Sequence, residues 1–282
     1  MSESNGSPQI YVFGRSVGEA QAIQQLAQIL APVTRQFLEQ AGLCAGMKVL
    51  EVGSGAGDVA LLAAELVSPT GMVIGVDHNP EILATARARA QAARLTQVAF
   101  VESDLTAVLL DDPFDAVVGR YILQHVRAPV LLLRHLVRHL RPGGIVAFQE
   151  VDLTRLGTSV PPLALFEQVG EWIKESLRRE GLDLQFGLSL YRLFLDAGLP
   201  PPQIHCQSFL GTGPDWPWYD VLAGRVGSVL PLLLKYGLVS AEEVEISTLA
   251  QRLRKAAAAN PGVVLAPDLV SAWTRTLHAA GC

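Results

Sequence analysis

Short apolar runs alternate with helical segments from Lys48 to about Asp152, and this alternation restricts the folds open to the chain. The runs are apolar throughout rather than at every second residue, which is typical of strands buried on both faces of a parallel sheet. Right-handed crossovers between such strands give a doubly wound α/β fold, whose ligands bind beyond the carboxyl ends of the strands. The expected strands are KVLEVG, MVIGVD, QVAFVES, FDAVVGR and GIVAFQEV, with helices near 58–67, 80–94 and 129–140 between them.

The segments on either side of this region are expected to be mainly helical. Apolar residues recur at helical spacing from about residue 16 to 41. Pro32 lies inside this segment, so we expect it to kink the helix or to divide it in two. On the other side of the core, residues 161–198 and 215–258 are also expected to be mostly helical.

Two further strands are expected in the last third of the chain. Residues 203–210 alternate in polarity, and residues 268–276 could pair with them as a final antiparallel strand; a short terminal helix is the competing interpretation. The expected organisation is therefore a helical N-terminal arm at 1–45, a core at 46–152, and a region at 153–282 with cap helices and the strands that complete the sheet.

The composition argues against several classes of function. The net charge of the 282 residues is −5 and no basic stretch stands out, so we do not expect a nucleic-acid partner. The three cysteines lie far apart, without metal-ligand spacing or a disulfide framework, so we predict no metal and expect free thiols in a reducing cytoplasm. No signal-peptide pattern and no long apolar run occurs, so we expect no membrane span.

A glycine-rich turn follows the first expected strand, in the sequence Glu51-Val-Gly-Ser-Gly-Ala-Gly-Asp58. Glycines at such a turn let the backbone approach a ligand closely. Dinucleotide-binding turns need a glycine at the sixth position, where this chain has Asp58, whose carboxylate would also repel phosphates. Acids on both sides of the glycines favour a cationic ligand instead, and the alternative is a strand–helix turn that binds nothing.

Polar side chains also follow the next strands. Asp77 ends the second strand, where a carboxylate can accept both hydroxyls of a ribose. The neighbouring His78 is interpreted either as flanking an adenine or as a surface residue. Asp104 follows the third strand and could accept from an adenine amine or cap a helical turn. Arg120 ends the fourth strand, where the backbone is expected to face the ligand.

Taken together, these segments resemble the class I S-adenosylmethionine (SAM)-dependent methyltransferases. The matching motifs are VLEVGSGAGD, GVDHNPEIL, ESDL, FDAVVGRYILQHV and LRPGGIVAFQE, between about Met47 and Asp152. The resemblance implies SAM as cofactor and a Rossmann-like sheet of seven strands, mostly parallel, with the last one antiparallel. It further implies that Glu51, Gly53, Ser54 and Gly55 hold the methionine part, that Gly57 and Asp58 complete the turn, that Asp77 binds the ribose, that Asp104 and Leu105 bind adenine, and that the backbone carbonyl of Arg120 accepts from the α-amine.

Two residues are candidates for catalysis or substrate contact. His125 follows the fourth strand and could accept a proton near neutral pH, or it could pack on the cofactor or cap a helix. Glu150 ends the fifth strand and could orient an amine or hydroxyl, or form an ion pair at the rim. The residues expected to line the acceptor pocket are Tyr11, Phe13 and Arg15 in the N-terminal arm and the aromatic cluster of Trp216, Trp218 and Tyr219 in the cap, where ordinary core packing is the alternative.

These predictions support an enzyme that moves a methyl group from SAM to an oxygen or nitrogen atom of a small molecule, its expected partner. The large helical cap favours small acceptors because it would exclude polymers. Two alternatives stay open from the sequence. The first is a SAM-binding enzyme of this fold with a non-methylating reaction such as cyclisation, and the second is a non-catalytic SAM-binding regulator, since the fold alone does not fix the function.

Overall fold

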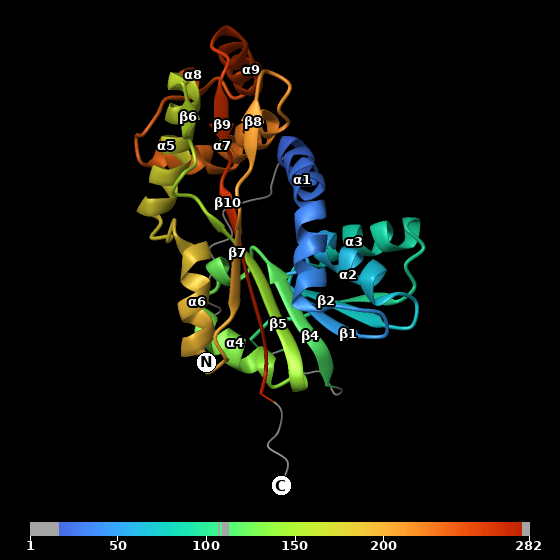
Figure 1. Cartoon of the computed structure of the whole chain (residues 1–282). Coiled ribbons are helices and arrows are strands. Elements are labelled where there is room, and N and C mark those ends of the chain that lie inside the picture. The colour runs from blue at the N-terminus through green and yellow to red at the C-terminus, as the bar shows by residue number, and fades with distance from the viewer. Residues whose placement is uncertain (1–16, 107, 109–112, 278–282) are drawn as a thin grey trace, which may run out of the picture.

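The computed structural model describes residues 17–277 without 107 and 109–112. Figure 1 shows a twisted sheet with helices on both faces and a second, mainly helical region at one end of it. The sheet has seven strands in the order β3-β2-β1-β4-β5-β10-β7, and β10 runs antiparallel to both of its neighbours. This arrangement confirms the expected fold class. The strands are β1 (Lys48–Val52), β2 (Met72–Asp77), β3 (Val98–Glu102), β4 (Phe114–Arg120), β5 (Leu140–Asp152), β7 (Gln203–Gln207) and β10 (Asp268–Arg275).

Both faces of the central strands are buried, which explains why their sequences are apolar throughout. Val49 and Leu50 of β1 are neighbours in sequence, and each is fully buried in a different apolar cluster. Successive strand residues point to opposite faces, so each face needs its own layer of helices. The Val49 face is covered by α1 (Val17–Ala41), α2 (Asp58–Val67) and α3 (Pro80–Ala92), and the Leu50 face by α4 (Pro129–Val137) and α6 (Phe186–Asp196).

The helix starts follow local sequence signals. Asn79 precedes α3, and its side-chain oxygen accepts hydrogen bonds from the backbone N–H groups of Glu81 and Ile82. Pro80 occupies the first helical position, where no N–H donor is needed. These contacts fix the end of β2, so that Asp77 lies at the carboxyl edge of the sheet.

Some of the expected boundaries are wrong. α1 is one continuous helix with Pro32 inside it, so the expected division at this residue does not occur. The buried side chains of Leu30, Phe37 and Leu38 pack on either side of the proline, and this packing offsets the missing N–H bond. The segment 161–198 is two helices, since residues 180–185 separate α5 (Ala164–Arg179) from α6.

The strand expected at 203–210 also ends earlier than predicted. β7 stops at Gln207, and Leu210 begins a strand of a second, three-stranded sheet in the order β6-β9-β8. The expected final strand is confirmed as β10, which rules out the terminal helix. The strands of the second sheet are β6 (Ser159–Val160), β8 (Leu210–Thr212) and β9 (Val263–Leu265).

The second sheet and four helices form a cap with an apolar cluster of its own. Phe166 of α5 and Tyr219 of α7 meet edge to face within this cluster. α1 reaches from the main sheet to the cap (Figure 1), where its Leu26 and Leu30 pack with Trp218 of α7. Within the described ranges, no helix has the length and apolar character needed to cross a membrane. The remaining cap helices are α7 (Trp218–Lys235), α8 (Ala241–Val244) and α9 (Leu249–Ala259).

Candidate functional site

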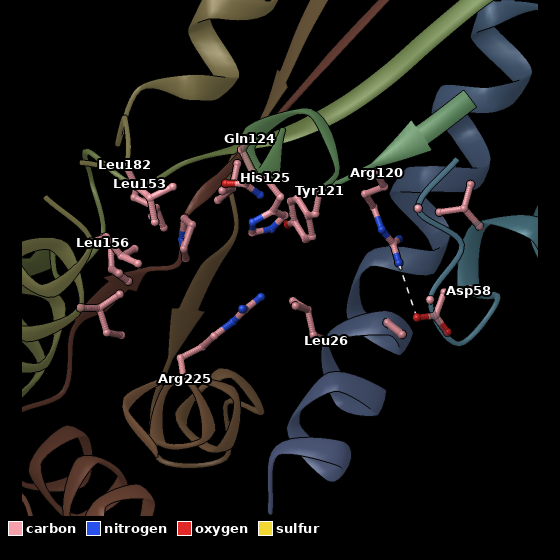
Figure 2. A pocket seen from close by; sticks show the side chains of 18 of the residues that line it. Leu26, Asp58, Arg120, Tyr121, Gln124, His125, Leu153, Leu156, Leu182 and Arg225 are labelled. Atoms are coloured by element: carbon pink, nitrogen blue, oxygen red, sulfur yellow. Dashed lines mark ion pairs between the residues drawn. The ribbon is translucent and has the colours of Figure 1, made fainter. Parts of the chain in front are cut away.

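A cavity of about 240 Å³ lies between the carboxyl ends of β1 and β4 and the cap. Figure 2 shows Asp58 and Arg120 at one end of the cavity, and Leu153, Leu156 and Leu182 at the other. The first end is formed by the glycine-rich turn after β1. The second end is formed by side chains of the cap and of the segments that lead to it. One continuous cavity therefore joins the predicted cofactor residues to an apolar wall.

The glycines of the turn have different roles. Gly53 has a φ of +69°, and a Cβ atom there would lie 2.6 Å from Cδ1 of Ile122, so this position requires glycine for both reasons. Gly55 has a φ of +50°, but a Cβ there would meet nothing within 4 Å. The backbone at Gly55 thus borders open space in the cavity, as a turn that receives a ligand requires.

Three carboxylates gather at this end of the cavity. Glu51 is buried and accepts a hydrogen bond from the hydroxyl of Ser54. Burial raises the pKa of Glu51 well above its usual range, the nearby Asp77 and Asp58 raise it further, and Arg120 opposes the rise. A cationic ligand would stabilise the ionised form of Glu51, so the electrostatics of the turn fit the sulfonium and ammonium groups of SAM.

Arg120 contributes its side chain to the site, a role that the sequence did not predict. Its Nη2 lies 3.9 Å from Oδ2 of Asp58, and its Nη1 donates to Oγ1 of Thr34 at 2.8 Å. Thr34 in turn donates to Oε1 of the buried Gln149 at 2.9 Å. These contacts hold the guanidinium at the wall of the cavity and tie α1 to the sheet.

Asp77 and His78 lie beside the glycine turn, outside the cavity lining. Oδ2 of Asp77 accepts from the backbone N–H of Gly55 at 2.9 Å, and its Oδ1 accepts from the N–H of Asn79 at 3.0 Å. Nδ1 of His78 is 3.4 Å from Oδ1 of Asp77, and the imidazole is half exposed. Asp77 thus already binds the backbone of the turn, and its ribose contact stays a prediction.

Asp104 and Leu105, the predicted adenine residues, follow β3. Oδ1 of Asp104 accepts from the N–H and the hydroxyl of Thr106, both at 2.7 Å, and these bonds lower the pKa of Asp104. This is the turn-capping contact that was the alternative interpretation of Asp104. Leu105 is buried in the cluster beneath the sheet edge, and the adenine role of both residues stays a prediction.

The two predicted catalytic residues occupy different layers. His125 ends a 3₁₀ turn (Leu123–His125) and lines the cavity. Glu150 lies beneath this turn, fully buried, and does not line the cavity. Its Oε1 accepts from the backbone N–H groups of Ile122 at 2.9 Å and Leu123 at 2.7 Å, and burial raises its pKa to about 8. Glu150 therefore holds the turn that carries His125.

Trp216 and Tyr219, two of the residues expected to line the acceptor pocket, do not line the cavity. Tyr11, Phe13 and Arg15 of the N-terminal arm lie outside the described residues. Trp216 and Tyr219 pack against each other with ring centroids 5.6 Å apart, and the Tyr219 hydroxyl donates to the backbone oxygen of Gly213. They lie in the cap core, behind the cavity wall.

Trp218 of α7, which was expected to line the acceptor pocket, lines the cavity, and so do Leu222 and Arg225, which the sequence did not indicate. The three share one face of the helix because they are four and three residues apart. The signal that could have identified this face is that spacing, with a charged residue where the pattern expects an apolar one. Tyr121 and Gln124, between Arg120 and His125, complete the polar part of the lining.

Comparisons with known proteins agree with this geometry. Residues 43–179 match a family model described as a methyltransferase domain. A demethylmenaquinone methyltransferase of Shouchella clausii is 32% identical over 136 residues, which are 48% of this chain and 55% of the relative. A trans-aconitate 2-methyltransferase of Azoarcus is 36% identical over 115 residues, 41% of this chain and 43% of the relative.

Solved structures extend the likeness beyond this segment, as a likeness of fold. The phosphoethanolamine N-methyltransferase 2 of Haemonchus contortus, solved with S-adenosylhomocysteine, has a TM-score of 0.55 at 17% identity. The match covers 91% of this chain and 58% of that chain. The chain spans about half the length of the curated relatives it matches. The matched segment holds β1 to β5 and the glycine turn, and it is similar in sequence to a methyltransferase domain.

Proposed function

We propose that the protein transfers a methyl group from SAM to an oxygen or nitrogen atom of a small molecule. The observation that carries this proposal is the single cavity shared by the glycine turn and the apolar wall of the cap. A cavity of this kind brings a cofactor and an acceptor together, and such positioning supplies much of the rate in a displacement reaction.

The residues at the turn fit the cofactor by their chemistry. Glu51, Ser54 and Gly55 border the open space that would receive the methionine part, and the side chain of Arg120 adds a cation there. When bound, SAM supplies a methyl group on a positively charged sulfur that a nucleophile can displace. We assign Asp77 to the ribose, and His78, Asp104 and Leu105 to the adenine.

On the acceptor side, we assign proton transfer to His125. A neutral imidazole in the cavity lining can take a proton from an O–H or N–H group of the acceptor. Glu150 acts as a positioning residue, because its carboxyl group holds the backbone of the turn that ends in His125. The leucines of the cap exclude water from this end of the cavity.

The acceptor is small in this proposal. The cavity of about 240 Å³ lies below the range of about 300 to 1,000 Å³ that is typical of ligand pockets. The two relatives described above are named for small acceptors. A net charge of −5 disfavours a nucleic-acid acceptor, and the widely spaced cysteines favour action in the cytoplasm.

Calorimetric titration with SAM tests the cofactor assignment. We expect wild-type protein to bind SAM, and Asp77→Ala to bind about a hundredfold more weakly, since it loses a charge-assisted contact to the ribose and the bond that fixes Gly55. Asp196→Ala is the matched control, because Asp196 lies at the end of α6 outside the cavity. No SAM binding by folded wild-type protein would refute the proposal.

A further inference from the structure

Arg225 is a cation that the cap directs into the middle of the cavity. Figure 2 shows its side chain extending from α7 toward Tyr121 and His125. The other cavity-facing residues of α7, Trp218 and Leu222, are buried and apolar. Arg225 therefore stands where the pattern of this helix face would place another apolar residue, and its side chain faces the cavity.

Two other charged side chains of the described lining lie toward the ends of the cavity. At the cofactor end, Arg120 is held by Asp58 and Thr34. At the far rim, Asp183 is exposed, and its Oδ1 accepts from the backbone N–H of Gln185 at 2.9 Å. Between them, burial raises the pKa of the Tyr121 phenol, and the guanidinium groups of Arg120 and Arg225 oppose that rise. The field of Arg225 thus acts at the centre of the cavity.

The surroundings of the Arg225 guanidinium favour a carboxylate as the group that it binds. Leu153, Leu156 and Leu182 form the wall beyond it (Figure 2), and hydrogen bonds between ions are stronger where water is excluded. A guanidinium matches the two coplanar oxygens of a carboxylate with two parallel hydrogen bonds. One guanidinium balances one negative charge, which favours a carboxylate over a doubly charged phosphate ester.

We propose that Arg225 binds a carboxylate of the acceptor, so that the acceptor is a small, largely apolar carboxylic acid. Its apolar body packs against the leucine wall, and its acidic group faces α7. This inference rests on the proposed function, since it names the class of acceptor for the same cavity.

The test compares acids with their neutral amides on the full chain saturated with S-adenosylhomocysteine. The probes are benzoate, phenylacetate and hexanoate, each paired with its amide, and calorimetry measures the six affinities. We expect wild-type protein to bind the acids about ten to a hundred times more tightly than the amides. Arg225→Met should abolish this preference and leave the affinity for the amides within about twofold.

Arg178→Met is the matched control, because Arg178 lies on α5 with its side chain half exposed and paired to Glu171 and Glu175. This variant should keep the preference for acids. The proposal is overturned if wild-type protein shows no preference across the three pairs, or if Arg225→Met retains it. A separate titration of wild-type protein with S-adenosylhomocysteine, and a repeat of the acid and amide titrations without it, distinguish the two hypotheses. Failure of wild-type protein to bind S-adenosylhomocysteine counts against the proposed function, while the preference for acids over amides decides the acceptor class.

Discussion

The two ends of the cavity are built in different ways. The cofactor end comes mainly from one short stretch, residues 51–58, in which a strand, a glycine turn and a helix start follow one another directly, and Arg120 of β4 adds its side chain. The acceptor end comes from segments that are far apart in sequence, including the loop after β5, α5 and α7. Backbone conformation defines the first end, and side-chain packing defines the second.

The two ends therefore tolerate substitution to different degrees. A backbone turn with positive φ values tolerates few substitutions, whereas a wall of leucines keeps its apolar character through many exchanges of similar volume. We therefore expect that a change at the acceptor end leaves cofactor binding intact, and that the converse also holds. Three substitutions test this independence.

Trp218→Ala has the largest expected effect. Trp218 is buried where α7 packs on Leu26 and Leu30 of α1, so its removal should cost about 3 to 5 kcal/mol of unfolding free energy, measured with urea. Below the unfolding transition, SAM affinity should stay within about twofold of wild type. The half-buried Trp216 serves as control, with a smaller loss expected for Trp216→Ala. Folded Trp218→Ala without SAM binding would show that the two ends are coupled.

Glu51→Gln should act on the cofactor end alone. A bound cation favours the ionised carboxylate, so wild-type affinity for SAM should increase as the pH rises through the raised pKa of Glu51. The glutamine has no charge to gain, so the variant should lack this increase and bind SAM about ten to a hundred times more weakly at pH 8. Glu65→Gln, at a half-exposed residue paired with Arg35, should behave as wild type. An unchanged pH profile in Glu51→Gln would contradict the assignment.

Glu150→Gln concerns the layer beneath the turn that lies between the two ends. Because the folded pKa of Glu150 is about 8, its contribution to stability is complete below about pH 4.5 and is lost as the pH rises through 8. Wild-type protein should therefore lose up to about 1.4 kcal/mol of unfolding free energy per pH unit from this group.

The glutamine variant has no proton to lose, so the slope should be flatter in urea unfolding series at pH 6, 7 and 8. Its side-chain oxygen can still accept from Ile122 and Leu123, which keeps the turn in place. The exposed Glu39 offers the control substitution Glu39→Gln, which should keep the wild-type slope. Equal slopes in wild type and Glu150→Gln would mean that the buried carboxyl group ionises without cost.

The fold could be predicted from the sequence because its signals are local. The apolar runs, the cap at Asn79 and the glycine turn each act within a few residues, and the strands from β1 to β5 lie where these signals indicate. The structure differs from the expected boundaries where a segment packs against residues that are distant in sequence. Pro32 stays inside one helix because α1 packs along the sheet, and Leu210 leaves the strand of β7 because it pairs with β9.

The site divides in the same way. Glu51, Gly53, Gly55 and Asp58 line the cavity, since they adjoin a strand end, and their contacts with the cofactor stay predictions. Trp216 and Tyr219 are aromatic but do not line the cavity, because Trp216 precedes α7 and Tyr219 lies on another face of that helix than Trp218. The spacing of Trp218, Leu222 and Arg225 defines a face of α7, but which surface this face meets depends on how α7 packs against α1 and α5.

The position of β10 has a consequence for synthesis of the chain. β10 pairs with β5 on one side and β7 on the other, although it begins at Asp268 and these strands end at Asp152 and Gln207. A nascent chain can assemble β1 to β5 early, but until β10 leaves the ribosome the edge of β5 has unpaired backbone groups that invite association with other chains. Completion of this sheet is thus the insertion of a strand between two strands that precede it in the chain, and a ribosome that stalls before β10 would leave an aggregation-prone product.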